Sequence, residues 1–399
     1  MIPLSEAREH VLGRVGRLPV VGVPVPEARG YVTAEDIFSP EPIPAFANTA
    51  MDGFAVRAAD VVDAPVELDI VGTIAAGAEP GLEVGEGQAA RIMTGAVIPE
   101  GADAVVMVEL TEVHGDRVRV TEAVARGNHI RLPGDDIASG EKVFEAGTVL
   151  TPGHLGVLSS LGLTEVRVYR RPRVGVLSTG DELVEGPGPL RPGQIRDSNR
   201  RTLLALAEES GFEAVDLGLV VDDEVLIERA IRRGVGECDA LMTSGGVSMG
   251  DFDFVKAVLS RIGDMRWMQI AIKPAKPFAF GTVDGIPVFG LPGNPVSSMV
   301  SFELLARPAL RSMMGHPRPF RVPVRAVAAE SLNRHADGKT HFLRVVMEMG
   351  ADGRVYVRSA GGQGSHMLAA MARADALAVV PDGTGVPSGA EVDILVFGE

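Results

Sequence analysis

Two carboxylates follow a glycine-rich turn in the stretch LMTSGGVSMGDFDFVK, residues 241–256. Glycine allows a close approach of the backbone to a ligand, and the free amides at the start of the following helix attract an anion. Asp251 and Asp253 would repel a phosphate unless a hard cation such as Mg²⁺ lay between them. The alternative is that one of them only caps the helix. The candidate binding residues before these carboxylates are Ser244, Gly245, Gly246 and Ser248.

Three further segments carry polar groups that could act with this turn. LSTGDELVE presents Thr179, Gly180, Asp181 and Glu182, and LPGNPVSSM presents Pro292, Gly293, Asn294, Ser297 and Ser298. IKPAKPFAFG places Lys273 and Lys276 three residues apart in a loop restrained by proline, which lowers the entropic cost of holding both ammonium groups on one target. Loop lysines are usually only solvated, but the rest of this loop is apolar. Acids, bases and free amides together indicate metal-assisted handling of a phosphate or another oxyanion.

A regular alternation of elements must position these groups. Strands are predicted over 173–180, 214–221, 239–244, 266–272 and 286–291, and helices over 198–211, 222–234, 294–308 and from Val255, whose apolar residues fall on one helix face. Ser198 or Asn199 is expected to cap the first of these helices and Gly211 to end it. The pattern predicts a doubly wound, mainly parallel α/β sheet, whose ligands bind beyond the carboxyl ends of the strands.

The rest of the chain favours β structure. A helix capped by Ser5 is expected to reach about Arg17, and short strands broken by turns follow it. We expect an α/β domain of residues 1–18 and 172–318, a connecting domain of residues 19–39 and 141–171, an inserted β-rich domain of residues 40–140, and an all-β domain of residues 319–399.

Composition excludes several classes of protein. The net charge of −15 over 399 residues argues against sequence-independent binding of nucleic acid. No run approaches the roughly 18 apolar residues of a membrane span, and the N-terminus does not resemble a signal peptide, so a soluble cytoplasmic protein is expected. The single cysteine, Cys238, excludes internal disulfides and multi-cysteine zinc sites.

The motifs also resemble a known family. NTAMDGFAV, RIMTGAVIPEGADAVVMVE, RLPGDDI, STGDEL, GQIRDSN, TSGGVSMGDFD, KPAKPFAFG and GLPGNPVSS occur in the order found in molybdopterin molybdenumtransferases, the bacterial MoeA proteins and the related C-terminal domain of gephyrin. The resemblance covers nearly the whole chain. It implies Mg²⁺-dependent insertion of molybdate into the dithiolene of adenylylated molybdopterin, with release of AMP.

The resemblance also implies roles for individual residues. Asp253, with Asp251 and Ser248, matches the nucleotide and Mg²⁺ turn. The positions that match the oxyanion pocket are Lys273, Lys276, Pro277, a serine of GNPVSS (Ser297 or Ser298), Arg344 and Ser365. The last two lie in the tail, which the resemblance assigns to the partner subunit of a homodimer.

Five more positions match functionally sensitive residues of the family: Asp52, Thr94, Arg131, Asp136 and Glu182. Asp52 and Thr94 could instead only form turns, and Asp136 could be a solvated acidic turn residue. The lysine loop departs from the family pattern at Ala275, where glycine is usual, and this matters only if the position needs a positive φ.

Two alternatives stay open. A molybdopterin adenylyltransferase would consume ATP instead of releasing AMP, but the long β-rich flanking segments speak against it. A non-enzymatic scaffold of the same fold would not need the charged residues of the pocket. Partners would include an adenylyltransferase that delivers the substrate and molybdoenzymes that receive the product. The sequence leaves the choice between molybdate and tungstate open.

Overall fold

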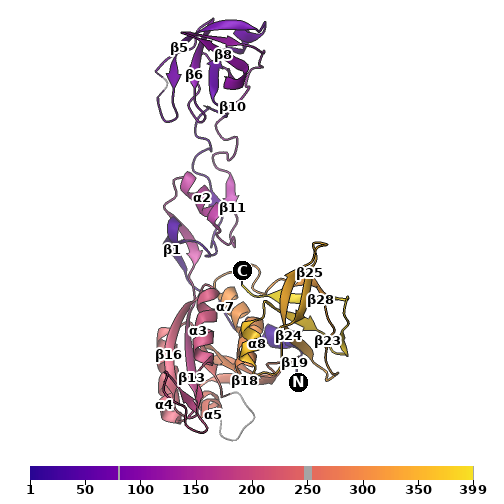
Figure 1. Cartoon of the computed structure of the whole chain (residues 1–399). Helices are drawn as coiled ribbons and strands as arrows, with labels where there is room; N and C mark the ends of the chain where they lie inside the picture. The colour runs from indigo at the N-terminus through magenta and orange to yellow at the C-terminus, as the bar shows by residue number, and fades with distance from the viewer. Residues whose placement is uncertain (80, 247–253, 399) are drawn as a thin grey trace.

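The computed structural model describes residues 1–79, 81–246 and 254–398. Figure 1 shows an elongated molecule, with a β-rich unit at one end, an α/β unit and a second β unit at the other, and a slender connection between them. Ser248, Asp251 and Asp253 lie outside the described residues. None of the helices in the described part of the chain is long and apolar enough to cross a membrane.

A six-stranded sheet forms the α/β unit, in the order β16-β13-β17-β21-β20-β18. The first four strands are parallel and β20 runs in the opposite direction. Their bounds are β13 Arg173–Thr179, β16 Glu213–Val220, β17 Ala240–Ser244, β18 Asp264–Gln269, β20 Pro277–Val283 and β21 Ile286–Leu291. The mainly parallel sheet confirms the predicted fold class. Residues 272–281, expected to form a loop restrained by proline, are mostly strand, because the burial of Phe278 and Phe280 extends β20 from Pro277.

Helices cover both faces of this sheet. On one face, Val174 and Val176 of β13 pack in a core with α1, α3, α6 and α7; on the other, Leu177 packs in a core with α4 and α5. The bounds are α1 Leu4–Leu12, α3 Asn199–Glu209, α4 Glu224–Glu237, α5 Phe254–Ile262, α6 Pro295–Ser301, a π-helix at Phe302–Ala306 and α7 Arg307–Met313. The helix expected to reach Arg17 ends earlier, with Gly13 as its C-cap, and Pro3 rather than Ser5 precedes it.

The chain leaves the α/β unit along β1 and returns along its partner β12, passing through the distant β-rich unit on the way. The connection contains β1 Val20–Pro24, a 3₁₀ turn at Val25–Glu27, β2 Ile37–Phe38, β11 Lys142–Phe144, α2 Pro152–Ser160 and β12 Glu165–Tyr169. The β-rich unit has a sheet in the order β7-β4-β6-β5-β9-β8, and β3 pairs with β10 below it. Its bounds are β3 Asn48–Thr49, β4 Gly53–Val56, β5 Val66–Ile74, β6 Gln88–Ile92, β7 Ala104–Met107, β8 Thr111–His114, β9 Arg117–Val120 and β10 Ile130–Arg131, with 3₁₀ turns at Ala58–Val61 and Val108–Leu110.

The C-terminal strands form a closed sheet, in the order β19-β24-β25-β22-β28-β26 with an added β24–β26 pairing. The bounds are β22 Val324–Ala328, β23 Leu332–Asn333, β24 Thr340–Met349, β25 Val355–Ser359, α8 Leu368–Ala372, β26 Ala376–Val380, β27 Gly385–Val386 and β28 Glu391–Val396. One strand of this sheet, β19 (Ile272–Lys273), comes from the α/β unit and pairs in parallel with β24. The two units are therefore joined through a shared sheet.

A buried arginine fixes the strand ends of the α/β unit. Arg200, at the start of α3, is 2% exposed, and its Nε donates to Asp197, whose side chain is also buried. Its other nitrogens contact Asp216 of β16 and Glu185. Asp197 also accepts from the hydroxyl of Ser178 in β13. This network joins β13, β16 and the segment that contains the short pair β14 (Leu183–Val184) and β15 (Ile195–Arg196).

Replacing Arg200 by alanine would leave the carboxylate of Asp197 buried without its cation. We expect Arg200→Ala to lower the free energy of unfolding by about 3–5 kcal/mol. Unfolding can be followed by the fluorescence of Trp267, the only tryptophan, because this residue lies in β18 of the sheet. Arg201→Ala is the matched control: Arg201 contacts the same two acidic partners, Glu185 and Asp216, but is mostly exposed, so a loss below about 1 kcal/mol is expected. Equal losses would contradict this account.

Candidate functional site

Three strand-end turns meet at the carboxyl edge of the sheet. Ser178 of β13 lies beside Ser244 of β17, which lies beside Leu291 of β21. The turns that begin at Thr179, Gly245 and Pro292 are therefore neighbours. Gly246 has a φ of +73°, and a Cβ there would lie 2.2 Å from the Cβ of Val255, so this turn can only be closed by glycine.

Asn199 ties two of these turns together. Its Nδ2 donates to the hydroxyl of Ser244 at 2.8 Å and to the carbonyl of Gly293 at 2.6 Å. Sequence reasoning assigned Asn199 only to a helix cap. The available signal was its position at the end of GQIRDSN, where it begins a helix at the same sheet edge.

Asp181 and Glu182 border this edge from the β13 side, and both are exposed. Asp181 accepts from the backbone amide of Asp222 at 3.1 Å, which links the first turn to the segment after β16. Glu182 lies beside Gly180, whose φ is +151°. Both carboxylates are accessible to a ligand above the strand ends.

The lysine segment borders a separate pocket of about 740 Å³, a size that suits an organic ligand. Lys273 and Lys276 are exposed in it and form no ion pair with any residue that the structure describes. Ala275 between them has a φ of +72° and is 2% exposed. The position that usually holds glycine thus does need a left-handed backbone, and alanine is strained there. Other lining residues include Pro277, Asn294, Ser297 and Ser365.

The tail reaches this pocket within a single chain. Lys273 pairs with His341 across β19 and β24, and the carbonyl of Ser365 accepts from the amide of Val296 at 3.1 Å. The expectation that the partner subunit supplies this tail was wrong for Ser365, because the shared sheet brings it to the pocket from the same chain.

Arg344 lies behind the pocket and not in its wall. Its side chain is fully buried, and Nη2 donates to the carbonyls of Gly362 and Gly364 at 2.8 and 3.2 Å. Burial lowers the pKa of its guanidinium, and within the described part of the chain its Nε and Nη1 have no hydrogen-bond partner. Arg344 therefore supports the loop that carries Ser365. Ser298 is also buried, one residue beyond the lining Ser297.

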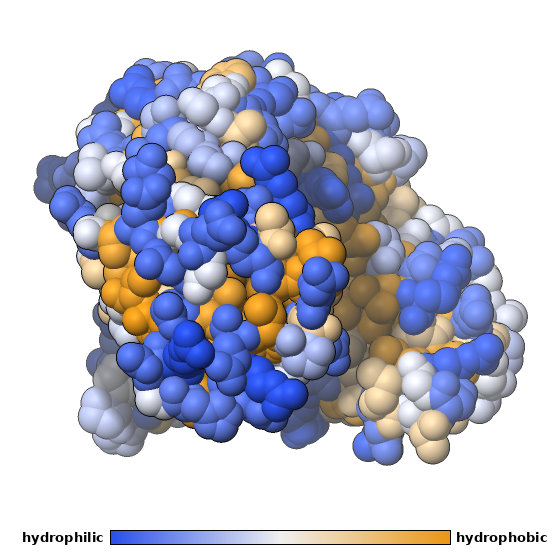
Figure 2. Space-filling view, turned by 90° about the horizontal axis from the view of Figure 1, so that it is seen from above, coloured by the Kyte–Doolittle hydropathy of each residue, from blue (hydrophilic) through white to orange (hydrophobic). Residues whose placement is uncertain are grey.

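Four of the predicted site residues lie far from this pocket within one chain: Asp52, Thr94, Arg131 and Asp136. They lie in the β-rich unit and at its base, at the far end of Figure 1. Thr94 donates through its amide and its hydroxyl to Asp52 Oδ1, both at 2.7 Å, and these bonds lower the pKa of Asp52. The contact joins two loops that lie 42 residues apart in the chain, so it does not form a local turn. Figure 2 looks down on this end and shows apolar side chains exposed among charged ones; Met51 and Leu132, beside Asp52 and Arg131 in sequence, are 41% and 57% exposed.

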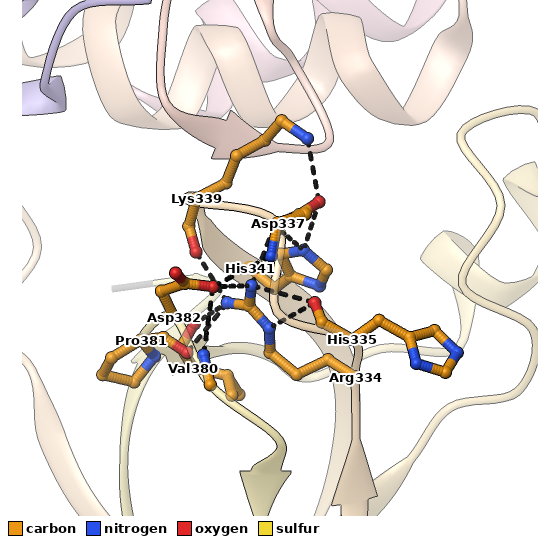
Figure 3. A network of polar contacts seen from close by, with 9 residues as sticks. Arg334, His335, Asp337, Lys339, His341, Val380, Pro381 and Asp382 are labelled. Atoms are coloured by element: carbon orange, nitrogen blue, oxygen red, sulfur yellow. Dashed lines mark hydrogen bonds and ion pairs between the residues drawn. The ribbon is translucent and has the colours of Figure 1, made fainter.

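A polar network on the opposite pocket wall was missed by sequence reasoning. In Figure 3, Lys339 and His341 point toward Asp337, while Arg334 reaches Asp337, Asp382 and backbone carbonyls. Asp337 accepts from Lys339 Nζ at 2.8 Å, from Arg334 Nη2 at 2.8 Å, and lies 3.2 Å from His341 Nε2. The hydrogen bonds from Lys339 and His341 hold the pKa of Asp337 far below its usual range, although burial opposes them. The segment NRHADGKTH did contain the signal, since it holds five ionisable groups beside a strand.

Metal binding was expected at Asp251 and Asp253, which the structure does not describe. Among the residues it does describe, no three histidine, cysteine, aspartate or glutamate side chains are grouped so that they could hold a metal ion.

Comparisons with known proteins agree across the whole chain. Residues 2–162 match the MoeA N-terminal region (domain I and II), residues 175–312 a probable molybdopterin binding domain, and residues 325–397 the MoeA C-terminal region (domain IV). The chain is 40% identical to a molybdopterin molybdenumtransferase of Haemophilus influenzae, over 100% of this chain and 99% of that protein. It is 34% identical to one of Bacillus subtilis, over 100% and 94%. A crystal structure of a molybdopterin biosynthesis MoeA protein from Pyrococcus horikoshii OT3 superposes with a TM-score of 0.85 at 31% identity, with both chains fully covered. The chain therefore belongs to the MoeA family of molybdopterin molybdenumtransferases, enzymes of molybdenum cofactor biosynthesis.

Proposed function

We propose that this enzyme inserts molybdate into adenylylated molybdopterin in a Mg²⁺-dependent reaction that releases AMP. The observation that carries the proposal is the charge of the pocket between Lys273 and the tail. Full-length similarity to proteins named for the transferase favours this function over an adenylyltransferase or a scaffold.

The charges of the pocket wall suit a doubly negative oxyanion. Its walls bring together the cations of Lys273, Lys276, Lys339 and Arg334, while the carboxylates of Asp337 and Asp382 neutralise two of them. About two positive charges are left over for a ligand. Asn294, Ser297, Gln363 and Ser365 add neutral hydrogen-bonding groups. A tetrahedral oxyanion of charge −2, such as molybdate, is the complementary ligand.

The strand-end turns suit the nucleotide part of the substrate. The positive φ of Gly245 and Gly246 lets the backbone come close to a phosphate, and Asn199 keeps the neighbouring turn in place. Asp251 and Asp253 would hold Mg²⁺ through carboxylate oxygens, the ligands this ion prefers, and Asp181 and Glu182 border the same edge. Bound Mg²⁺ would offset the repulsion between these carboxylates and the phosphates and stabilise negative charge on the leaving AMP.

One group of predicted site residues lies far from the α/β edge of its own chain. This distance supports a homodimer in which the two subunits share each site. Asp52, Thr94, Arg131 and Asp136 lie far from the α/β edge of their own chain (Figure 1). A second copy could bring its β-rich unit to that edge under two-fold symmetry. We also propose the domain boundaries given above, a cytoplasmic location, and an adenylyltransferase and molybdoenzymes as partners.

Removing a pocket cation should weaken use of the oxyanion. Because a hydrogen bond to a charged group contributes about 1.5–3 kcal/mol, Lys276→Met should raise the apparent KM for molybdate roughly 10- to 100-fold. The rate of cofactor formation is measured against molybdate concentration at saturating adenylylated molybdopterin. Lys142→Met, at an exposed lysine of β11 outside the pocket, is the control. An unchanged KM in the Lys276 variant would contradict the oxyanion site.

The turn carboxylates are tested by product release. The wild-type protein with adenylylated molybdopterin and Mg²⁺ should release AMP and reconstitute a cofactor-free molybdoenzyme only when molybdate is present. Asp253→Ala should fold normally and release AMP at least about 10²-fold more slowly, the usual scale for losing electrostatic stabilisation of a leaving group. Wild-type rates of AMP release in this variant would remove the metal turn from the proposal.

A shared site predicts complementation between two inactive variants. Asp52→Ala and Lys273→Met proteins, unfolded and refolded together, would form about half heterodimers, each with one intact site. Activity should therefore recover to about a quarter of the wild-type value. The same variants refolded separately and then combined are the control. No recovery in co-refolded samples that contain heterodimer would mean that each site is built from one chain.

A further inference from the structure

We propose that His341 transfers protons in the oxyanion pocket, from a substrate thiol to the oxygen that leaves the oxyanion. The inference rests on the proposed function and assigns a chemical role to a residue of the same pocket. It is carried by the position of the imidazole, by its contact with Asp337, and by the chemistry of replacing oxygen with sulfur.

His341 lies where an oxyanion held by the lysines could be reached. It is 4% exposed, lines the pocket, and pairs directly with Lys273 across β19 and β24. Paired residues on neighbouring strands place their side chains on the same face of the sheet, so the imidazole and the Lys273 ammonium are neighbours.

Asp337 fixes the orientation of the ring. An ionised carboxylate can only accept hydrogen bonds, so His341 Nε2 must carry the proton that lies between them. Asp337 is kept ionised by Lys339 and Arg334 (Figure 3). Nδ1 is then left with a lone pair, and among the described residues nothing donates a hydrogen bond to it. An imidazole oriented by a carboxylate, with its other nitrogen accessible, is the usual arrangement for general acid–base catalysis.

The charges around His341 favour the neutral ring. Burial lowers its pKa most, the charges of Arg334 and Lys273 lower it further, and Asp337 opposes them. At neutral pH the imidazole can therefore accept a proton at Nδ1.

The reaction requires such a transfer. When a dithiol reacts with molybdate, two molybdenum–sulfur bonds form and one molybdenum–oxygen bond breaks. The two thiol protons leave with the oxygen as water, the total charge stays at −2, and no atom changes its oxidation state. Lys273 and Lys276 can stabilise the oxyanion, but as ammonium ions they cannot accept a thiol proton. His341 can accept each proton and deliver it to the departing oxygen.

Two substitutions separate proton transfer from binding. His341→Gln keeps a polar side chain but cannot carry a proton, so kcat for cofactor formation should fall about 10²-fold or more while the KM for molybdate changes less than about 3-fold. Asp337→Asn should lower kcat about 10-fold, because a partner that only orients the ring is less critical. A His341→Gln protein with wild-type kcat would overturn the inference, as would a loss confined to KM.

The pH profile gives a second readout. Neutral imidazole is the active form, so wild-type kcat should fall as the pH drops below the lowered pKa of His341, which lies under the ordinary value of about 6.5. This acidic limb should be absent from the His341→Gln profile. Identical profiles for the two proteins would overturn the inference.

Chemical rescue distinguishes a missing proton carrier from a packing defect. His341→Ala leaves space in an open pocket. Added imidazole should raise the rate of this variant at least about 10-fold over its rate without imidazole. His114→Ala, at an exposed histidine of β8, should not respond to imidazole. Failure of imidazole to restore activity in a folded His341→Ala protein would favour a structural role.

A binding measurement keeps the inference separable from the proposed function. The imidazole signals of His341, assigned by their loss in His341→Gln, should shift when molybdate alone is added to the wild-type protein. Unshifted signals at saturating molybdate would overturn the inference, whereas the proposed function would fail only if the wild-type protein released no AMP with its full set of substrates.

Discussion

The candidate site depends on one short strand pairing. β19 has two residues, yet its parallel contact with β24 brings Lys273 of the α/β unit beside His341 of the C-terminal sheet. Main-chain hydrogen bonds set the register of this pairing, and a slip of β19 by one residue would turn Lys273 to the face of the sheet opposite His341. The lysine segment, the acidic network and the loop that carries Ser365 therefore form one site only while this pairing is intact. The positive φ of Ala275, two residues after Lys273, shows that the backbone accepts strain at this junction.

Buried arginines serve as internal supports around the two ligand sites. Arg200 holds the segment above β13 and β16 through carboxylates, and Arg334 holds the acidic network through Asp337, Asp382 and backbone carbonyls. Arg344 supports the 362–364 loop through carbonyl oxygens alone. Because a guanidinium presents five donors in a rigid plane, one side chain can hold several segments of loop in fixed positions.

The shape of the chain separates two groups of polar residues that the motifs place together. The pocket and the strand-end turns lie at one end, and the contact between Asp52 and Thr94 lies at the other. The slender connection between the ends is held mainly by two-stranded pairings such as β1 with β12. This geometry suits a unit that reaches over a neighbouring subunit, which is the arrangement that the proposed homodimer requires.

The sequence alone determined the α/β order of strands and helices, the helix face of Val255, Val258 and Leu259, and the convergence of the strand-end turns, because these follow from local periodicity and from the direction of parallel strands. Ordered motifs also determined the family. Only the tertiary structure decided that Ser365 reaches the pocket within one chain, that Arg344 lies behind it, and that Asp337, Lys339 and His341 complete its wall. Those outcomes depend on contacts between residues far apart in the chain, and the register of β19 against β24 leaves no periodic signal in either segment.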